Sequence, residues 1–243
     1  MPLTFFTFSS PPKFYRLTGY LIPVCWAIFV VLCAIGLYMG FFVAPTDATQ
    51  GEVYRVIFIH VPAAWMSMLL YLVMAFWAAI GWAFNARLAS MVARAVAPTG
   101  AIFTFLALWT GALWGKPTWG TWWVWDARLT SELILLFLYL GFMALVEAID
   151  DTRRGDQAGA LLAIVGAVNV PIIYFSVKWW NTLHQGASVS PTMAPKMAST
   201  MLTAMLLMSL AFWAYAFAMA FTRTRALILE RERDAHWVAE LKI

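Results

Sequence analysis

Residues 20–43 read YLIPVCWAIFVVLCAIGLYMGFFV, a continuous apolar run that contains no charged side chain. A helix needs roughly 20 mainly apolar residues to cross the hydrocarbon core of a bilayer, and this run is long enough. Because only helices and closed barrels span membranes, we predict an all-α, polytopic membrane protein built as a six-transmembrane-helix bundle. The predicted spans are about 20–43, 56–84, 95–114, 129–149, 158–177 and 198–221.

The composition of the whole chain agrees with this prediction. Of its 243 residues, 63% are hydrophobic and 12% are charged, whereas a soluble domain is about half apolar and about a quarter charged. We therefore expect a single integral-membrane domain over residues 1–243. Cys25 and Cys33 both lie in the first apolar run, so neither a disulfide nor a thiolate metal site is expected. The first residues do not resemble a secretory signal, and the first helix is expected to be retained.

Lysine and arginine are unevenly divided between the two sides of the predicted bundle. Eleven of the sixteen fall at the chain ends and in the loops 85–94 and 150–157. The positive-inside rule places the more basic side in the cytoplasm, so both termini are predicted to be cytoplasmic. The segments predicted to face outward are 43–55, 115–128 and 178–197.

Two prolines are expected to disturb helices, and the tail is expected to be solvated. Pro62 favours a break near the start of the second span, because the residue before a proline is pushed away from helical geometry. Pro171 lies inside the fifth span and should kink it. The polar tail after Thr222 is expected to be a solvated helix end, or otherwise a docking surface for a cytoplasmic partner.

The segment 114–126, WGKPTWGTWWVWD, is unusually rich in tryptophan. Tryptophan belts are common at membrane interfaces, and a belt is one interpretation. Five tryptophans in thirteen residues exceed what anchoring requires, so we favour an outward aromatic surface for a flat apolar ligand. The alternative interpretation of Asp126 is that it caps the fourth helix. The residues expected to form the surface are Trp114, Trp119, Trp122, Trp123, Trp125 and Asp126.

Histidine is rare in this chain, and its placement suggests the ligand. His60 and His184 both map to the predicted outward side, whereas His236 lies in the tail and is expected to be solvated. Neutral imidazole ligates iron, and haem is a flat apolar macrocycle held by axial ligands. We therefore predict one non-covalently bound, b-type haem with His60 and His184 as its axial iron ligands. The alternative is that one histidine hydrogen-bonds within the protein while water or a partner supplies the second ligand.

Haem carries two propionates, which require cationic partners. Arg55 and Arg128 are the candidates, because arginine suits bidentate recognition of a carboxylate. The alternative for Arg128 is an ion pair with Glu132 one helical turn later. Lys178 and Lys196 are expected to be solvated.

Several function classes are disfavoured by what the predicted spans contain. Glu132 and Glu147 are their only charged residues, and a proton or ion pump is expected to carry more along its path. No histidine maps to the inner half, as an electron carrier across the membrane would need. No Ser–His–Asp or metal-hydrolase spacing is present, so we expect no enzyme, and nothing indicates nucleic-acid binding.

Residues 119–126, WGTWWVWD, fit the W-G-x-x-W-x-W-D signature of the haem-handling protein family. The continuation DARLTSELILLFLYLGF, the segment HVPAAW at 60–65 and WWNTLHQGAS at 179–188 resemble one branch of it. That branch is the six-helix C protein of bacterial system I cytochrome c maturation, and the resemblance covers nearly the whole chain. The matching positions are His60, His184, Trp119, Trp122, Trp123, Trp125 and Asp126.

The resemblance implies a role in c-type cytochrome biogenesis. It implies that the chain binds haem in transit at the periplasmic face of the bacterial inner membrane and delivers it to a periplasmic haem chaperone, the E protein. It also implies a complex with a small single-helix D protein and with an ABC transporter formed by A and B proteins, where ATP is hydrolysed. Besides membrane lipid, these are the expected partners. The alternatives are a haem-free structural permease subunit of an ABC transporter and a respiratory haem b electron-transfer subunit.

Overall fold

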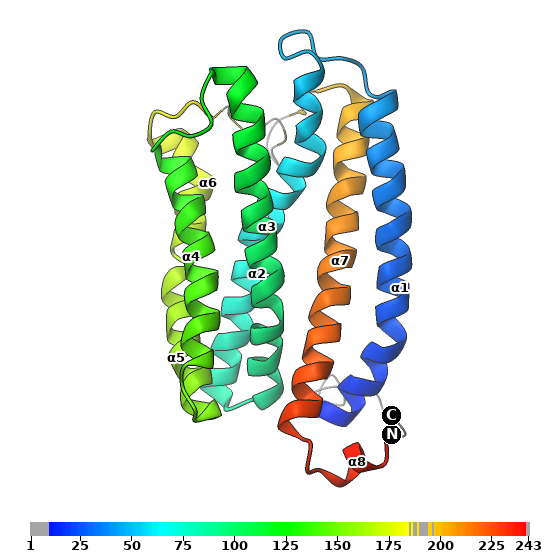
Figure 1. Ribbon diagram of the computed structural model, residues 1–243, viewed down its shortest axis with the longest axis vertical. Coiled ribbons are helices and arrows are strands. Elements are labelled where there is room, and N and C mark those ends of the chain that lie inside the picture. Colours follow the sequence, from blue (N-terminus) through cyan, green and yellow to red (C-terminus); the bar gives the residue numbers. More distant parts are fainter. Residues whose placement is uncertain (1–9, 185, 187–188, 190–193, 196, 242–243) are drawn as a thin grey trace.

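The computed structural model describes residues 10–184, 186, 189, 194–195 and 197–241, and shows a long bundle of helices (Figure 1). Six helical stretches are long and apolar enough to cross a membrane, which confirms the predicted fold class. Lys196 and the first nine residues lie outside the described part. The helices are α1 Pro11–Tyr38, α2 Ile57–Phe84, α3 Arg87–Trp119, α4 Ala127–Glu147, α5 Thr152–Gly166, α6 Asn169–Trp179, α7 Ser199–Arg231 and α8 His236–Ala239, with a π-helical turn η2 Met39–Val43 and a 3-10 turn η3 Glu52–Val56.

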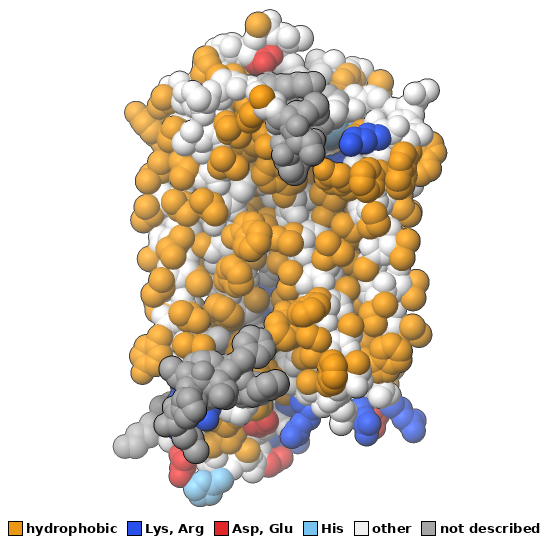
Figure 2. All heavy atoms as spheres, turned by 180° about the vertical axis from the view of Figure 1, so that it is seen from behind, with side chains coloured by type: hydrophobic (Ala, Val, Ile, Leu, Met, Phe, Trp, Pro, Cys, Tyr) orange, Lys and Arg blue, Asp and Glu red, His pale blue; other side chains and the backbone are white. Residues whose placement is uncertain are grey.

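The helices form two unequal groups. α2 and α3 pack along each other, and α4 and the α5–α6 pair complete the larger group. α1 packs mainly on α7, which in turn contacts α2 and α3 (Figure 1). The centre of the core lies along α2, where Phe58, Tyr71 and Met74 are fully buried. The outer surface is a belt of exposed apolar side chains (Figure 2), as expected for helices solvated by lipid.

Three helices extend beyond the predicted spans. α1 begins at Pro11, α3 begins at Arg87, and α7 continues to Arg231. The predicted loop 85–94 is therefore wrong: the connection is Asn85 and Ala86 alone, with Asn85 in the left-handed region at φ 51°. Polar residues continue a helix where it leaves the hydrocarbon, and hydropathy does not register them as part of the span.

The last turns of α7 are packed, so the prediction of a solvated helix end is wrong for this part of the tail. The Arg225 guanidinium lies over the ring of Tyr15 in α1, 3.5 Å from its centroid. Arg231 forms a two-point ion pair with Asp156 of α5, at 2.8 and 2.9 Å. Both contacts tie the end of α7 to other helices.

The two prolines behave differently. Pro62 does not break its helix: α2 is continuous from Ile57, so that prediction is wrong. Pro62 is the sixth residue of α2, and the helix accommodates it without the hydrogen bond that an N–H there would donate to the Phe58 carbonyl. Pro171 does interrupt its span, which divides into α5 and α6 with a turn at Ala167 and Val168. The break falls at Ala167, whose carbonyl is the one that the ring of Pro171 would meet in a continuous helix.

Candidate functional site

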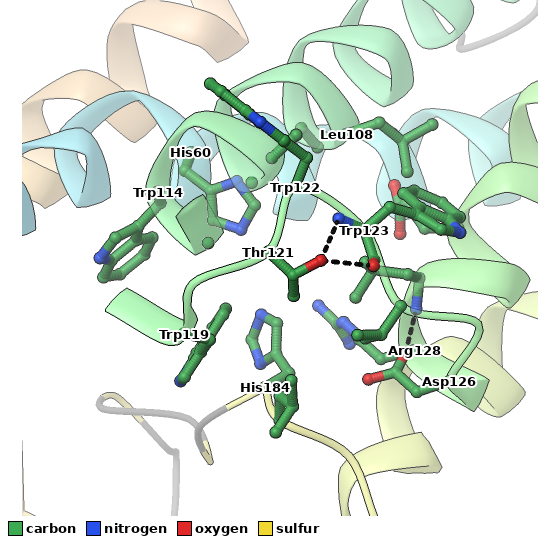
Figure 3. Close-up of a pocket in the computed structure, with 18 of the residues that line it drawn as sticks. His60, Leu108, Trp114, Trp119, Thr121, Trp122, Trp123, Asp126, Arg128 and His184 are labelled. Carbon is green, nitrogen blue, oxygen red and sulfur yellow. Dashed lines mark hydrogen bonds between the residues drawn. The ribbon is translucent and has the colours of Figure 1, made fainter. Parts of the chain in front are cut away.

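A cavity of about 60 Å³ lies at the end of the bundle opposite the described chain ends. It is enclosed by the start of α2, the end of α3, the start of α4 and the segment that follows α6 (Figure 3). The sequence-predicted residues that line it are His60, Trp114, Trp119, Trp122, Trp123, Asp126, Arg128 and His184.

His60 and His184 are brought together from distant parts of the chain. Their ring centroids lie 6.3 Å apart, and the ring planes are tilted by 37° (Figure 3). An imidazole nitrogen lies about 2 Å from a metal that it ligates, so two imidazoles sharing one metal have ring centres roughly 6 Å apart. The observed separation therefore suits a shared metal. His236, by contrast, lies exposed in α8 and contacts Glu240, as predicted for a solvated histidine.

Hydrogen bonds to α3 favour one tautomer of His60. Its Nδ1 lies 3.0 Å from the hydroxyl of Thr110 on α3. That hydroxyl donates its single hydrogen to the Leu106 carbonyl, at 2.6 Å, so it accepts from Nδ1–H of His60. Nε2 then carries the lone pair and is the nitrogen available to a metal.

Gly111 provides the space for this imidazole. A Cβ at that position would lie 3.0 Å from Cε1 of His60, closer than ordinary packing. The ring also meets the buried Trp114 edge-on, with centroids 5.7 Å apart. The indole N–H of Trp114 in turn donates to the side-chain oxygen of Gln50, at 2.7 Å.

The tryptophan-rich segment is only partly a loop. α3 continues to Trp119 and ends at Gly120, which has a left-handed φ of 81°, so Trp114 and Trp119 lie on a helix. Trp122 and Trp123 line the cavity from the loop, and the Trp123 indole nitrogen is buried with no partner among the described residues. Trp125 is 77% exposed and lies outside the lining, edge-on to Trp123.

Asp126 caps α4, as the alternative interpretation predicted. One carboxylate oxygen accepts from the backbone N–H of Leu129, at 2.8 Å. The other accepts from the hydroxyl of Thr182, and the backbone N–H of His184 donates to the same Thr182 oxygen, at 3.1 Å. Asp126 thus connects the start of α4 to the segment that carries His184.

Arg128 and Glu132 both line the cavity, yet the structure contains no ion pair between them. The Arg128 guanidinium donates to the Ile173 carbonyl of α6, at 2.8 Å. One oxygen of the buried Glu132 accepts from the hydroxyl of Ser67, at 2.6 Å. Its other oxygen has no partner among the described residues. The predicted pairing of these two residues is therefore not observed.

Arg55 lies outside the cavity lining, in η3. Its guanidinium contacts the carboxylate of Glu52 and donates to the carbonyls of Gly40 and Ala44, at 2.5 and 3.1 Å. These contacts tie the end of η2 to the start of α2. A role for Arg55 in binding a carboxylate stays a prediction.

Sequence reasoning missed three residues that hold the histidines: Thr110, Gly111 and Thr182. Thr182 could have been suspected from its place two residues before His184, the spacing of a hydroxyl-capped turn. Thr110 and Gly111 carry no such signal, because their roles depend on which face of α3 meets α2.

The donor set points to a particular kind of metal. Across the part of the chain that the structure describes, no group of three or more His, Cys, Asp or Glu side chains could hold a metal ion. Two imidazoles on an aromatic cavity instead suit a metal that brings its other ligands with it, as the iron of a macrocycle does.

Comparison with known proteins gives a consistent match. Residues 4–239 match the family described as Heme exporter protein C. The chain is 46% identical over 238 residues to the heme exporter protein C of Escherichia coli (strain K12), covering 96% of this chain and 94% of that protein. It is 49% identical over 210 residues to the heme exporter protein C of Bradyrhizobium diazoefficiens, covering 86% and 80%. It is also 46% identical over 176 residues to a putative cytochrome c biosynthesis ccmC-like mitochondrial protein of Marchantia polymorpha, covering 72% and 73%.

Proposed function

The chain belongs to the heme exporter protein C family, and we propose that it binds haem as cargo between His60 and His184 and passes it to a partner protein. The site faces the periplasm in this proposal, on the outer side of the bacterial inner membrane. The chain is a transport subunit and not an enzyme.

The observation that carries the proposal is the pairing of the two imidazoles. Their 6.3 Å separation suits one iron between them, and the Thr110 hydrogen bond leaves Nε2 of His60 free to ligate. Two axial histidines leave no open position on the iron, which suits a protein that must hold haem without activating oxygen.

The cavity also sets a condition for binding. Ligand pockets have volumes of about 300–1,000 Å³, whereas the space between the histidines and tryptophans is about 60 Å³. A whole macrocycle therefore requires the loop with Trp122 and Trp123 to move away from the two histidines. Such a site holds its cargo at the surface, and one axial ligand can be exchanged for a partner's residue while the other still holds the iron.

Arg128 is the propionate partner that the geometry favours. Its guanidinium lines the cavity and donates to the neutral Ile173 carbonyl, and a carboxylate would accept a stronger, charge-assisted hydrogen bond from it. Arg55 would first have to break its ion pair with Glu52 before it could bind a propionate.

The proposed partners follow from the family. The haem goes to a periplasmic chaperone, the E protein, for attachment to c-type cytochromes. A single-helix D protein and the A and B proteins of an ABC transporter complete the complex, with ATP hydrolysed by the transporter. The exposed Trp125 is available to contact the chaperone.

The test is spectroscopic. His60→Gly and His184→Gly proteins, purified from haem-replete cells, should show altered iron ligation, and added imidazole should restore the original spectrum. His236→Gly is the matched control, because this exposed histidine lies at the other end of the bundle, and it should leave the spectrum unchanged. Wild-type ligation in either site variant would remove that histidine from the proposal. Protein that never carries haem would favour the haem-free permease subunit.

A further inference from the structure

A second cavity lies at the opposite end of the bundle from the histidines. It has a volume of about 380 Å³ and is formed where α2 ends, α3 and α5 begin, and α7 ends. Several polar and basic side chains line it: Arg87, Arg153, Arg231, Asn85, Thr152 and Gln157.

The charges in this cavity are not balanced. Asp156 is the only acidic residue among those lining it, and Arg231 already holds it in a two-point ion pair in which both side chains are 13% exposed. Arg87 and Arg153 make no hydrogen bond or ion pair within the described residues, which leaves two uncommitted guanidinium groups. Both guanidinium groups are exposed to solvent, so they remain available to an anion that enters the cavity.

The cavity lies at the depth of lipid headgroups. Trp82, which lines it, is 53% exposed, and the neighbouring Phe84 is 77% exposed at the end of α2. Exposed aromatic residues at a helix end mark the boundary between hydrocarbon and headgroups. Figure 2 shows the apolar belt ending just above a rim of Lys and Arg side chains at this end.

We propose that this cavity binds the phosphate of an anionic phospholipid from the adjacent leaflet, with Arg87 and Arg153 as the ligands. The planar fork of arginine matches phosphate oxygens, and basic pockets between transmembrane helices take anionic headgroups. A soluble phosphate offers the same chemistry. The lipid is favoured because the cavity opens beside exposed aromatic side chains, along which acyl chains can pack. A partner protein is disfavoured because the uncommitted charges line a cavity of headgroup size and not a broad surface.

The test measures retained lipid. The full-length protein is purified into phosphatidylcholine nanodiscs that contain a small fraction of phosphatidylglycerol, and native mass spectrometry counts the phosphatidylglycerol molecules that stay bound. The Arg87→Gln/Arg153→Gln double variant should bind this lipid roughly 25-fold more weakly, about fivefold for each arginine. Arg16→Gln/Arg154→Gln is the control: it removes the same charge from two exposed arginines outside the cavity and should retain the lipid. Arg87→Lys/Arg153→Lys keeps the charge but removes the planar guanidinium groups, and should weaken lipid binding by an intermediate amount. This variant tests the role of the guanidinium geometry even if the Gln variant fails to insert into the membrane.

The other outcomes separate the alternatives. Equal loss in the cavity and control variants would mean diffuse attraction to the surface and would overturn the proposal. Displacement of the lipid by millimolar inorganic phosphate would reassign the cavity to a soluble anion. Unchanged lipid binding in both the Gln and the Lys variants would leave the arginines to a protein partner and would equally overturn it.

Discussion

Gly111 and Thr110 determine how His60 is presented to the cavity. Thr110 selects the tautomer, and the missing side chain of Gly111 leaves room for the ring. His60 itself lies on a regular helix, so its direction is fixed by α2 and by these two contacts from α3. A small change at either contact should therefore disturb the histidine without disturbing the bundle.

Gly111→Ala should reduce haem retention while leaving the helix intact. The new Cβ would lie 3.0 Å from His60 Cε1 and push the ring off its position. A displacement costing roughly 1–2 kcal/mol weakens haem binding about tenfold. Alanine favours the helix over glycine by up to about 1 kcal/mol, so thermal stability should not fall. Haem per protein from the Soret absorbance, together with the melting temperature, measures both effects.

Gly141→Ala is the matched control for this change. Its Cβ would meet only Leu162 at an ordinary 3.6 Å. Haem content should equal that of the wild type. A similar loss of haem in both variants would show that glycine replacement acts through the fold and not through His60.

The tryptophans of the loop should divide by function. Trp122 lines the cavity, whereas Trp125 lies outside it and is 77% exposed. Stacking of a desolvated aromatic is worth about 0.5–1.5 kcal/mol, so Trp122→Ala should weaken haem retention about two- to tenfold. Trp125→Ala should retain haem and slow its transfer to the chaperone, as measured by covalent haem on the purified chaperone. The reverse pattern would assign the haem contact to Trp125.

At the scale of elements, the start of α4 and the segment after α6 act as one unit through Asp126. Thr182→Val removes the hydroxyl that joins them, whereas Asp126→Asn keeps the cap of α4, since asparagine caps helices as well as aspartate. Both variants should fold and insert, and both should lower haem retention by loosening His184. The double variant should be no worse than the more severe single one, because both break the same link. Additive losses would instead indicate a direct contact of Asp126 with the cargo, and Thr182→Ser should behave as wild type.

The elements also show what hydropathy can and cannot predict. Six long apolar segments predicted six spans, because a helix must contain a minimum number of apolar residues to cross the bilayer. The ends were missed where helices continue in polar residues, as from Arg87 into α3. The division of the fifth span was predictable from Pro171, since the cause is local. The contact of Gly111 with His60 was not, because it depends on the rotation of α3 against α2.

At the scale of the whole molecule, the two sites occupy opposite ends. The histidine cavity lies at the end where α3 finishes, and the described parts of both chain ends lie with the basic cavity at the other (Figure 1). The histidines and tryptophans that line the first cavity could be named from the sequence, because these residue types are conspicuous among apolar residues. The basic cavity could not be predicted from the sequence. Its arginines fit the positive-inside pattern of cytoplasmic loops, and only the folded structure brings them together at the ends of four helices.

The orientation of the bundle remains a prediction, and it decides which compartment the haem reaches. The positive-inside rule places the basic end in the cytoplasm, so the turn before η3 should face the periplasm and the turn between α4 and α5 the cytoplasm. In a background with Cys25 and Cys33 replaced, Thr49→Cys should react with a membrane-impermeant maleimide in intact spheroplasts. Asp150→Cys, equally exposed at the other end, should react only after lysis. The opposite labelling pattern would place His60 and His184 on the cytoplasmic side and rule out direct delivery to a periplasmic chaperone. Labelling of both positions in intact spheroplasts would reveal mixed insertion, and the haem spectrum of each population would then have to be measured separately.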